Sequence, residues 1–143
     1  DKPAAMALAE EQISNGTALA KLRQMITCQG GDTDFSRLPK ADLVLPYKAK
    51  TGGYLAAIDA RKIGLAALCL GAGRSKKEDA IDPATGIVLR QKLAAQVQAG
   101  KILAEVHCRN QQQFDAAAAI LDAAFALADT APSCGPLISE IIH

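Results

Sequence analysis

The spacing of the apolar residues changes near residue 40, and this change constrains the fold more than any other feature of the sequence. Before it, Leu19, Leu22 and Ile26 recur at the i, i+3, i+7 spacing of an amphipathic helix. After it, short apolar segments such as Ala41–Leu45 and Gly53–Ile58 are bounded by proline or glycine, which is typical of strands. We therefore expect helices first and a mixture of strands and helices afterwards, which is an α+β chain.

The first part of the chain predicts two helices. The first covers Ala4–Gln12 and is interrupted by Asn15-Gly16, after which Thr17 is placed to cap the second helix. Gly30-Gly31 ends the second helix, and a polar loop follows over Asp32–Pro39. This loop is the best candidate for a boundary between two parts of the chain.

A third helix is expected after the two strands that flank Pro46. Asp59 is its predicted N-cap, and the helix runs to about Leu70. Its predicted buried face consists of Ile63, Ala67 and Leu70. Gly64 costs helix stability, and we explain it by the close approach of another backbone.

The remaining segments predict more strands and one long helix. The strand candidates are Thr85–Leu89, Gln96–Gln98 and Ile102–Cys108, the last two joined around Ala99-Gly100-Lys101. Asn110 and Gln113 form a capping box for the final helix. That helix is predicted to continue to Ala131-Pro132, because these residues keep a helical period: Phe114, Ala118, Leu121, Phe125 and Ala128. We expect Pro136–Ile142 to be an extended tail.

Composition excludes several classes of partner. Hydrophobic residues make up 50% of the 143 residues and charged residues 22%, which is typical of a globular domain. A net charge of +1 leaves no basic excess for nucleic acid. No apolar stretch approaches the roughly 20 residues that span a bilayer, and we identify no signal peptide, although the chain begins with Asp1 rather than Met and we expect processing or trimming. The four cysteines form no Cys-x-x-Cys pair, and although they could pair as disulfides, a domain with this much apolar content does not need them, so we expect reduced thiols and a cytoplasmic location.

Two glycine-rich stretches resemble phosphate loops by composition. Lys50-Thr51-Gly52-Gly53 is too short for a P-loop and precedes no helix, so a strand-to-strand turn is favoured over phosphate binding. Gly71-Ala72-Gly73-Arg74 follows a helix end, where the dipole disfavours an anion, and Gly71 is explained as a C-cap. Anion binding remains the alternative at both.

The acidic and histidine candidates also have structural explanations. Glu78, Asp79 and Asp82 could hold a hard cation, but salt bridges with Arg74, Lys76 and Lys77 are favoured, and we expect no metal site. His107 is interpreted as a hydrogen-bonded residue near a strand end rather than a general base. A catalytic pair of His107 and Cys108 is disfavoured because neighbours in a strand point to opposite faces. The residues alone therefore show no active site.

Several short stretches of the sequence form an ordered set, and their order and spacing are more informative than any one of them alone. They are Asn15-Gly16, Ala18-Leu19, Lys21-Leu22 and Gln29-Gly30-Gly31-Asp32; then Gly53-Tyr54-Leu55, Ile58-Asp59-Ala60 and Ile63-Gly64; then Leu70-Gly71-Ala72-Gly73-Arg74, Lys77-Glu78-Asp79, Ile81-Asp82 and Gly86-Ile87; and finally Val97, Gly100, Val106-His107 and Asn110. From about Ile13 to Ala131, this set is similar to the C-terminal region of bacterial pyrimidine-nucleoside and thymidine phosphorylases.

Two features depart from the family pattern. The family usually has Lys-x-Gly-Asp-x-Val, whereas Lys92 to Val97 lacks the Gly-Asp pair, which puts the tight turn there in question. Cys108-Arg109 stands where the family often has one small residue, which we interpret as a one-residue insertion.

The resemblance implies a fold and a parent reaction. Residues 1–32 would be helices of the central α/β lobe, and residues 40–143 a C-terminal α/β-hammerhead domain, related to biotinyl and lipoyl carriers. The parent reaction would be reversible phosphorolysis of a pyrimidine nucleoside to free base and pentose 1-phosphate, with phosphate as co-substrate and no cofactor. The family's phosphate- and base-binding residues lie upstream, so we assign no catalytic or substrate-binding residue here.

The resemblance also implies partners and a role. The partners would be the N-terminal helical and α/β lobes of a phosphorylase that forms a homodimer. We expect this part to complete the lobe that closes over substrate, with closure contacts from Arg74, Lys77, Glu78, Asp79 and His107. Two alternatives remain: a carrier or interaction module using Lys101, and a small independent enzyme using His107 and Cys108.

Overall fold

The computed structural model describes residues 1–74 and 76–136, together with Ile138, Glu140 and Ile142. The described chain forms two compact units, residues 1–38 and residues 39–143. It is a mixed α+β structure with four α-helices and two antiparallel sheets among the described residues. In the extended tail predicted for Pro136–Ile142, three residues (Leu137, Ser139 and Ile141) lie outside the described residues, and the other four belong to no helix or strand.

The first unit contains α1 (Lys2–Ser14), α2 (Thr17–Cys28) and a 3₁₀ turn, η1 (Phe35–Arg37). The predicted cap of α2 is wrong: Gly16, with φ of 82°, is the N-cap, and Thr17 is the first helical residue. The Thr17 hydroxyl instead bonds to Asn15 Oδ1 at 2.7 Å. No residue of these helices is buried, so neither helix has a core within the described chain.

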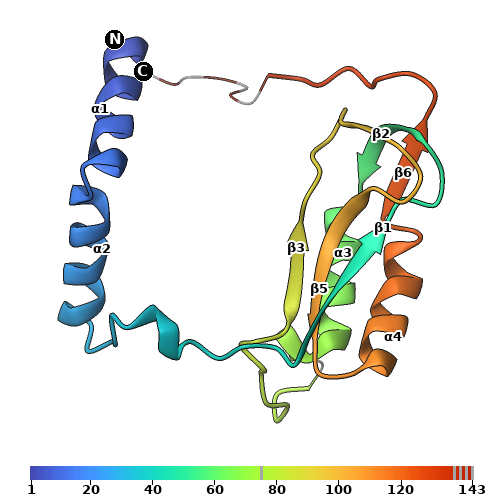
Figure 1. The fold of residues 1–143 in the computed structure, drawn as a ribbon, viewed down its shortest axis with the longest axis horizontal. Helices are drawn as coiled ribbons and strands as arrows, with labels where there is room; N and C mark the ends of the chain where they lie inside the picture. The colour runs from blue at the N-terminus through green and yellow to red at the C-terminus, as the bar shows by residue number, and fades with distance from the viewer. Residues whose placement is uncertain (75, 137, 139, 141, 143) are drawn as a thin grey trace. The chain divides into compact units, whose positions relative to one another are not determined.

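The second unit is built on two three-stranded antiparallel sheets (Figure 1). One sheet has the order β1-β5-β3, made of β1 (Leu43–Lys48), β5 (Ile102–Cys108) and β3 (Gly86–Leu89). The other has the order β4-β2-β6, made of β4 (Gln96–Val97), β2 (Gly53–Ile58) and β6 (Phe125–Ala128). The helices α3 (Ala60–Ala67) and α4 (Gln111–Leu121) pack against each other and along β3 and β5.

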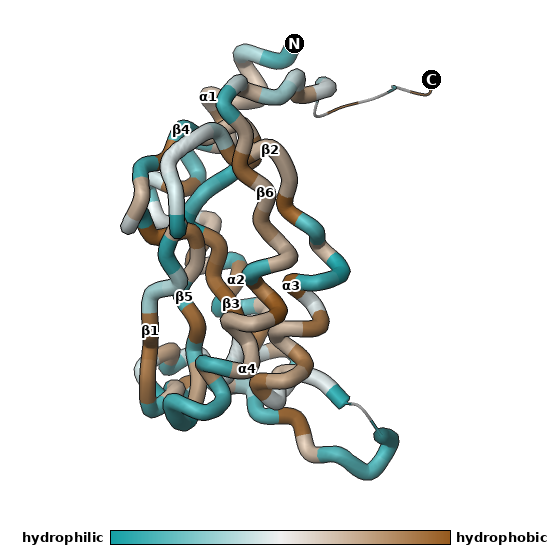
Figure 2. The backbone as a smooth tube through the Cα atoms, turned by 90° about the vertical axis from the view of Figure 1, so that its right-hand side faces the viewer, coloured by the Kyte–Doolittle hydropathy of each residue, from teal (hydrophilic) through white to brown (hydrophobic). Residues whose placement is uncertain are grey.

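Strand β5 carries much of the core. Its residues Ala104, Val106 and Cys108 are fully buried, as strand alternation requires for one covered face. They pack with Leu70 from the turn after α3 and with Leu121 from α4. Figure 2 shows the apolar stretches concentrated on these strands and helices, whereas the loop after α3 is hydrophilic.

Pro46 lies inside β1, opposite Glu105, so the expectation that it ends the strand is wrong. Because β1 is at the edge of its sheet, a residue without an amide hydrogen is tolerated there if its nitrogen faces away from β5. The same proline removes a donor from the open edge, which disfavours pairing with a further strand.

The long final helix is also a wrong prediction. Helix α4 ends at Leu121, and Phe125–Ala128 forms β6, which pairs with β2. The alanine-rich segment has high helix propensity, but strand pairing and the stacking of the Phe125 ring on Tyr47, 5.7 Å between centroids, override it.

The predicted caps are largely confirmed. Asp59 accepts the Lys62 amide at 3.1 Å, and Asn110 accepts the Gln113 amide at 2.9 Å. The Gln113 side chain bonds to the Arg109 amide, one residue before the N-cap, so the capping box is only half formed.

Helix α3 departs from its prediction in two places. The explanation for Gly64 is wrong, because a Cβ built there meets nothing within 4 Å. Ala66, rather than Ala67, is the fully buried alanine of this helix. The helix then passes into a π turn, η2 (Leu68–Ala72), in which Gly71 has φ of 94°, as expected of a glycine that ends a helix.

Candidate functional site

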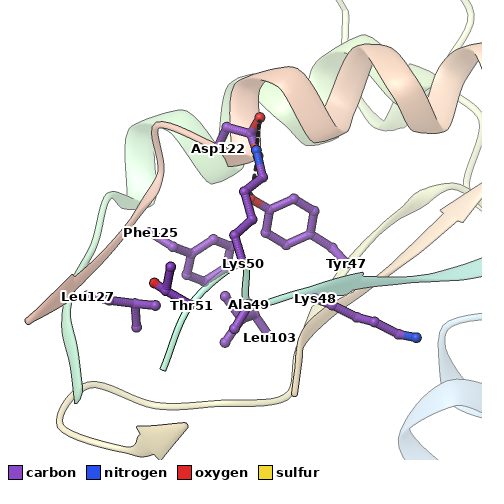
Figure 3. Close-up of a pocket in the computed structure, with 9 residues that line it drawn as sticks. All are labelled: Tyr47, Lys48, Ala49, Lys50, Thr51, Leu103, Asp122, Phe125 and Leu127. Carbon is purple, nitrogen blue, oxygen red and sulfur yellow. Dashed lines mark hydrogen bonds and ion pairs between the residues drawn. The ribbon is translucent and has the colours of Figure 1, made fainter. Parts of the chain in front are cut away.

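A cleft of about 240 Å³ lies between the end of β1 and strand β6 (Figure 3). Its polar centre is Asp122, the residue that follows α4. The Tyr47 hydroxyl donates to Asp122 Oδ1 at 2.8 Å, and Lys50 Nζ lies 2.7 Å from Asp122 Oδ2. Leu103, Phe125 and Leu127 supply the apolar lining.

The charges of this cluster are balanced internally. Lys50, followed by the Tyr47 hydroxyl, lowers the pKa of Asp122 below its usual range. Burial raises the pKa of Tyr47 above its ordinary value, and its bond to Asp122 adds to the shift. A carboxylate at a helix C-terminus is disfavoured by the helix dipole, so Lys50 and Tyr47 compensate for its position.

The geometry of this cluster favours a structural role, the connection of the two sheets, over a catalytic one. Tyr47 and Lys50 belong to the end of β1 and the turn after it, whereas Asp122 and Phe125 lead into β6. The Tyr47 proton is held by a carboxylate, and the Lys50 ammonium is already paired, so neither is poised as a general base. Lys50-Thr51-Gly52-Gly53 connects β1 to β2, which confirms the strand-to-strand turn.

A second polar network surrounds Arg109, at the end of β5. Arg109 Nε donates to Asp82 Oδ2 at 2.6 Å and Nη2 donates to Asp82 Oδ1 at 2.8 Å. Nη1 donates to the Lys40 carbonyl at 3.0 Å and lies 3.4 Å from Asp42 Oδ1. The Arg109 guanidinium lowers the pKa of Asp82, and this pairing raises the pKa of Arg109.

For Asp82, the salt bridge expected of the acidic cluster has a different partner. Asp82 pairs with Arg109, whereas Arg74, Lys76 and Lys77 were the predicted cations. The Lys76 backbone amide donates to Asp79 Oδ2 at 2.8 Å. Among the described residues, no group of His, Cys, Asp and Glu side chains could hold a metal ion.

The five closure candidates do not form one cluster. Arg74, Lys77 and Glu78 are exposed on the loop after η2, and Asp79 is half-buried there. His107 lies in β5 between Val44 and Gly86 of the neighbouring strands. In the described part of the chain, no hydrogen bond or ion pair joins His107 to Arg74, Lys77 or Glu78.

His107 faces away from the core. Its neighbours Val106 and Cys108 are fully buried on the opposite face, and burial raises the pKa of the Cys108 thiol. The argument against a catalytic His107–Cys108 pair is therefore confirmed. The His107 ring lines two shallow hollows, one with Thr85–Val88 and one with Pro39–Ala41.

The structure also gives the positions of the lysine and the cysteines that the sequence analysis considered. Lys101 is exposed in the turn between β4 and β5, but these strands belong to different sheets, so it is not at the tip of a hairpin. The four cysteines are free, and Cys108 is buried whereas Cys69 is exposed. No described helix combines the length and apolar character needed to cross a membrane.

Sequence reasoning missed the two networks. Arg109 was interpreted as an insertion, and neither Tyr47 nor Asp122 was considered. The sequence feature that could have identified Arg109 as a functional candidate is its position directly after a buried strand and directly before an N-cap. Its partners Asp82 and Asp42 are 27 and 67 residues distant in sequence, so spacing could not identify them.

Residues 54–128 match the sequence model of the pyrimidine nucleoside phosphorylase C-terminal domain; they run from the second residue of β2 to the end of β6 and include α3 and α4. The chain belongs to this family. Its relatives include the pyrimidine-nucleoside phosphorylases of Staphylococcus aureus strains USA300 and NCTC 8325 / PS 47, each 42% identical over 96% of this chain. The aligned region is 32% of each relative, so this family member spans about a third of their length.

Proposed function

We propose that this chain is the C-terminal part of an enzyme that carries out phosphorolysis of pyrimidine nucleosides. The observation that carries the proposal is the 42% identity along 96% of the chain to relatives named pyrimidine-nucleoside phosphorylase. The substrates would be a pyrimidine nucleoside and phosphate, and the products a free base and pentose 1-phosphate. Phosphate would be the co-substrate, and no cofactor is needed.

The proposed role of this part is to support the fold and the closure of the enzyme, while the active site lies elsewhere. In support, the charged groups at the centres of the two polar networks, Asp122 with Lys50 and Asp82 with Arg109, are paired with each other. Arg74, Lys77 and Glu78 remain exposed on a loop, where they are available to a partner surface. The two small sheets with packed helices are compatible with an α/β-hammerhead.

The proposed partners are the helical and α/β lobes of a homodimeric phosphorylase. Helices α1 and α2 would belong to the α/β lobe. In support, large apolar side chains of these helices are exposed: Met6, Leu8, Ile13, Leu19, Leu22 and Met25. Helices of 13 and 12 residues are marginal alone in water, so their stability requires a covering surface.

The test is phosphate-dependent release of base from thymidine and uridine. We expect no release by the 143-residue chain alone and clear release by the longer phosphorylase that contains it. In that longer enzyme, Arg74→Ala should lower kcat without changing the thermal stability of this domain. Release of base by the chain alone would contradict the placement of the active site, and unchanged kinetics in Arg74→Ala would remove Arg74 from closure.

A further inference from the structure

The Arg109 guanidinium contacts two segments that are far apart in the sequence. We call Lys40–Asp42 the leading segment, because it lies near the start of the second unit, and Asp82–Thr85 the loop end, because it follows the exposed loop after η2. Arg109 donates to the Lys40 carbonyl and lies near Asp42 in the first, and it holds Asp82 through two nitrogen atoms in the second. All the contacted groups belong to the second unit.

Asp82 is itself fixed in several directions. Its amide donates to the Gly71 carbonyl at 2.9 Å, and its Oδ1 accepts the Ala84 amide at 3.0 Å. Its carbonyl accepts from both the amide and the hydroxyl of Thr85, at 3.3 Å and 3.2 Å. The position of Asp82 therefore sets the end of η2 and the start of β3 together.

The two segments also face one another. Pro39–Ala41 and Pro83-Ala84 line a single hollow of about 370 Å³ with His107. The Arg109 backbone is held in turn by the Gln113 side chain, which accepts its amide at 2.8 Å. The guanidinium is thus anchored on the junction of β5 and α4 and reaches both sides of this hollow.

We infer that Arg109 is a positioning residue that links the leading segment to the loop end, so that the two segments open together rather than independently. The planar guanidinium is suited to this, because it presents its donors in a rigid fork that holds a carboxylate and a carbonyl at once. The inference rests on the proposed function only where it makes the loop a closure element. In that setting, a movement of the leading segment would also move the loop that carries Arg74.

Limited trypsin digestion of the 143-residue chain tests the linkage, because the leading segment contains one cleavage site, Lys40, and the exposed loop that runs into the loop end contains others. Cleavage after Lys40 reports opening of the leading segment, and cleavage after Lys76 or Lys77 reports opening of the loop. Cleavage of a native chain tracks the population of locally open forms. Arg109→Gln should raise the initial rates at both places, by roughly three- to tenfold.

The decisive variant is Asp82→Asn, because no hydrogen bond or ion pair joins Asp82 to Lys40 among the described residues and Arg109 is the group that bonds to both. If the linkage exists, Asp82→Asn raises cleavage after Lys40 as well as in the loop, and the double variant cleaves after Lys40 no faster than Arg109→Gln alone. If Asp82→Asn accelerates only the loop sites, the two segments are independent and the inference is overturned.

Two further variants keep the result interpretable. Arg90→Gln removes an arginine paired with Glu105 elsewhere on the same sheet and should change neither rate. Arg109→Lys keeps the charge but lacks the fork, so it should protect one segment and leave the other open. If Arg109→Gln does not fold, Arg109→Lys and Asp82→Asn still decide the question. None of these rates involves phosphorolysis, so the linkage and the proposed function can fail separately.

Discussion

Ala94 holds a backbone conformation that glycine adopts far more readily. Its φ is 65°, the only positive value among the non-glycine residues that the structure describes. The turn is nevertheless complete, because the Ala95 amide donates to the Lys92 carbonyl at 3.1 Å and Ala94 pairs with the Leu55 carbonyl at 2.9 Å. The tight turn that the missing Gly-Asp pair put in question is therefore present, with an alanine at the position that the family pattern gives to glycine.

Replacing this alanine should stabilise the protein. Ala94→Gly relieves the left-handed strain and should raise the free energy of unfolding by about 1 kcal/mol, less the entropy that glycine gains in the unfolded chain. Urea denaturation of the two proteins measures the difference. Ala95→Gly is the matched control and should destabilise, because Ala95 is not in the left-handed region. A destabilised Ala94→Gly would mean that the turn has another conformation.

Asp122 gives the stability a dependence on pH. Its pKa in the folded protein is lowered by Lys50 and Tyr47, so its stabilising contribution is present above the unfolded pKa and is lost as the pH falls through the folded value. Asp122→Asn should therefore destabilise at pH 7, and the difference from the parent protein should shrink as the pH falls below about 4. Because the Asp122 side chain is 42% exposed, the loss at pH 7 should stay below about 1 kcal/mol.

Thermal unfolding across this pH range measures the effect. Tyr47→Phe removes one of the two bonds to Asp122 and should reproduce part of the loss at pH 7. Asp129→Asn, at an exposed position after β6, should leave the stability unchanged. A difference for Asp122→Asn that persists undiminished at low pH would assign its cost to packing instead of charge.

At the scale of elements, most patterns with local causes were predictable, the cap predicted at Thr17 being an exception, and patterns set by distant partners were not. The caps at Asp59 and Asn110 depend on residues three positions away, and both were predicted. Strand β6 was mistaken for helix because its pairing with β2 joins residues about 70 positions apart in sequence. The Arg109 network was missed for the same reason, because the partners of Arg109 come from two distant segments that meet only in the folded protein, at the end of β5.

The assignment of residues 125–128 as strand β6 can be tested with one substitution, because the change in the free energy of unfolding should have opposite signs in a strand and in a helix. Ala126 is exposed and pairs directly with exposed Ala57. In a strand, Ala126→Thr gains from the preference of β-branched residues for pleated surfaces, and it should stabilise by a few tenths, about 0.3 kcal/mol. In a helix the same change would cost about 0.5 kcal/mol.

The matched control is Ala116→Thr, at an exposed position inside α4. It should destabilise, because a β-branched side chain loses rotamer freedom in a helix. Urea denaturation of both variants measures the two changes in the free energy of unfolding under the same conditions. Destabilisation of similar size in both would favour the continuous helix that the sequence alone predicts.

At the scale of the whole molecule, the core belongs to one unit. Every residue of the buried cluster lies between Tyr47 and Ala124, whereas none of α1 or α2 is buried. The exposed apolar faces of those helices thus contribute little to the stability of this chain by itself. This is the division expected if residues 1–38 are completed by another part of a longer enzyme.

A chain that begins at Pro39 should therefore unfold cooperatively with nearly the same midpoint as the 143-residue chain. We expect the midpoints to agree within about 4 °C, the shift that 1 kcal/mol produces in a domain of this size. Far-UV circular dichroism should show the loss of helical signal from α1 and α2 with the β signal retained. The complementary control removes β6 and everything after it, which takes away the partner of β2 and the ring that stacks on Tyr47, and this protein should not fold. If the chain that begins at Pro39 also loses cooperative unfolding, the helices stabilise the second unit directly, and their exposed faces are not reserved for a missing partner.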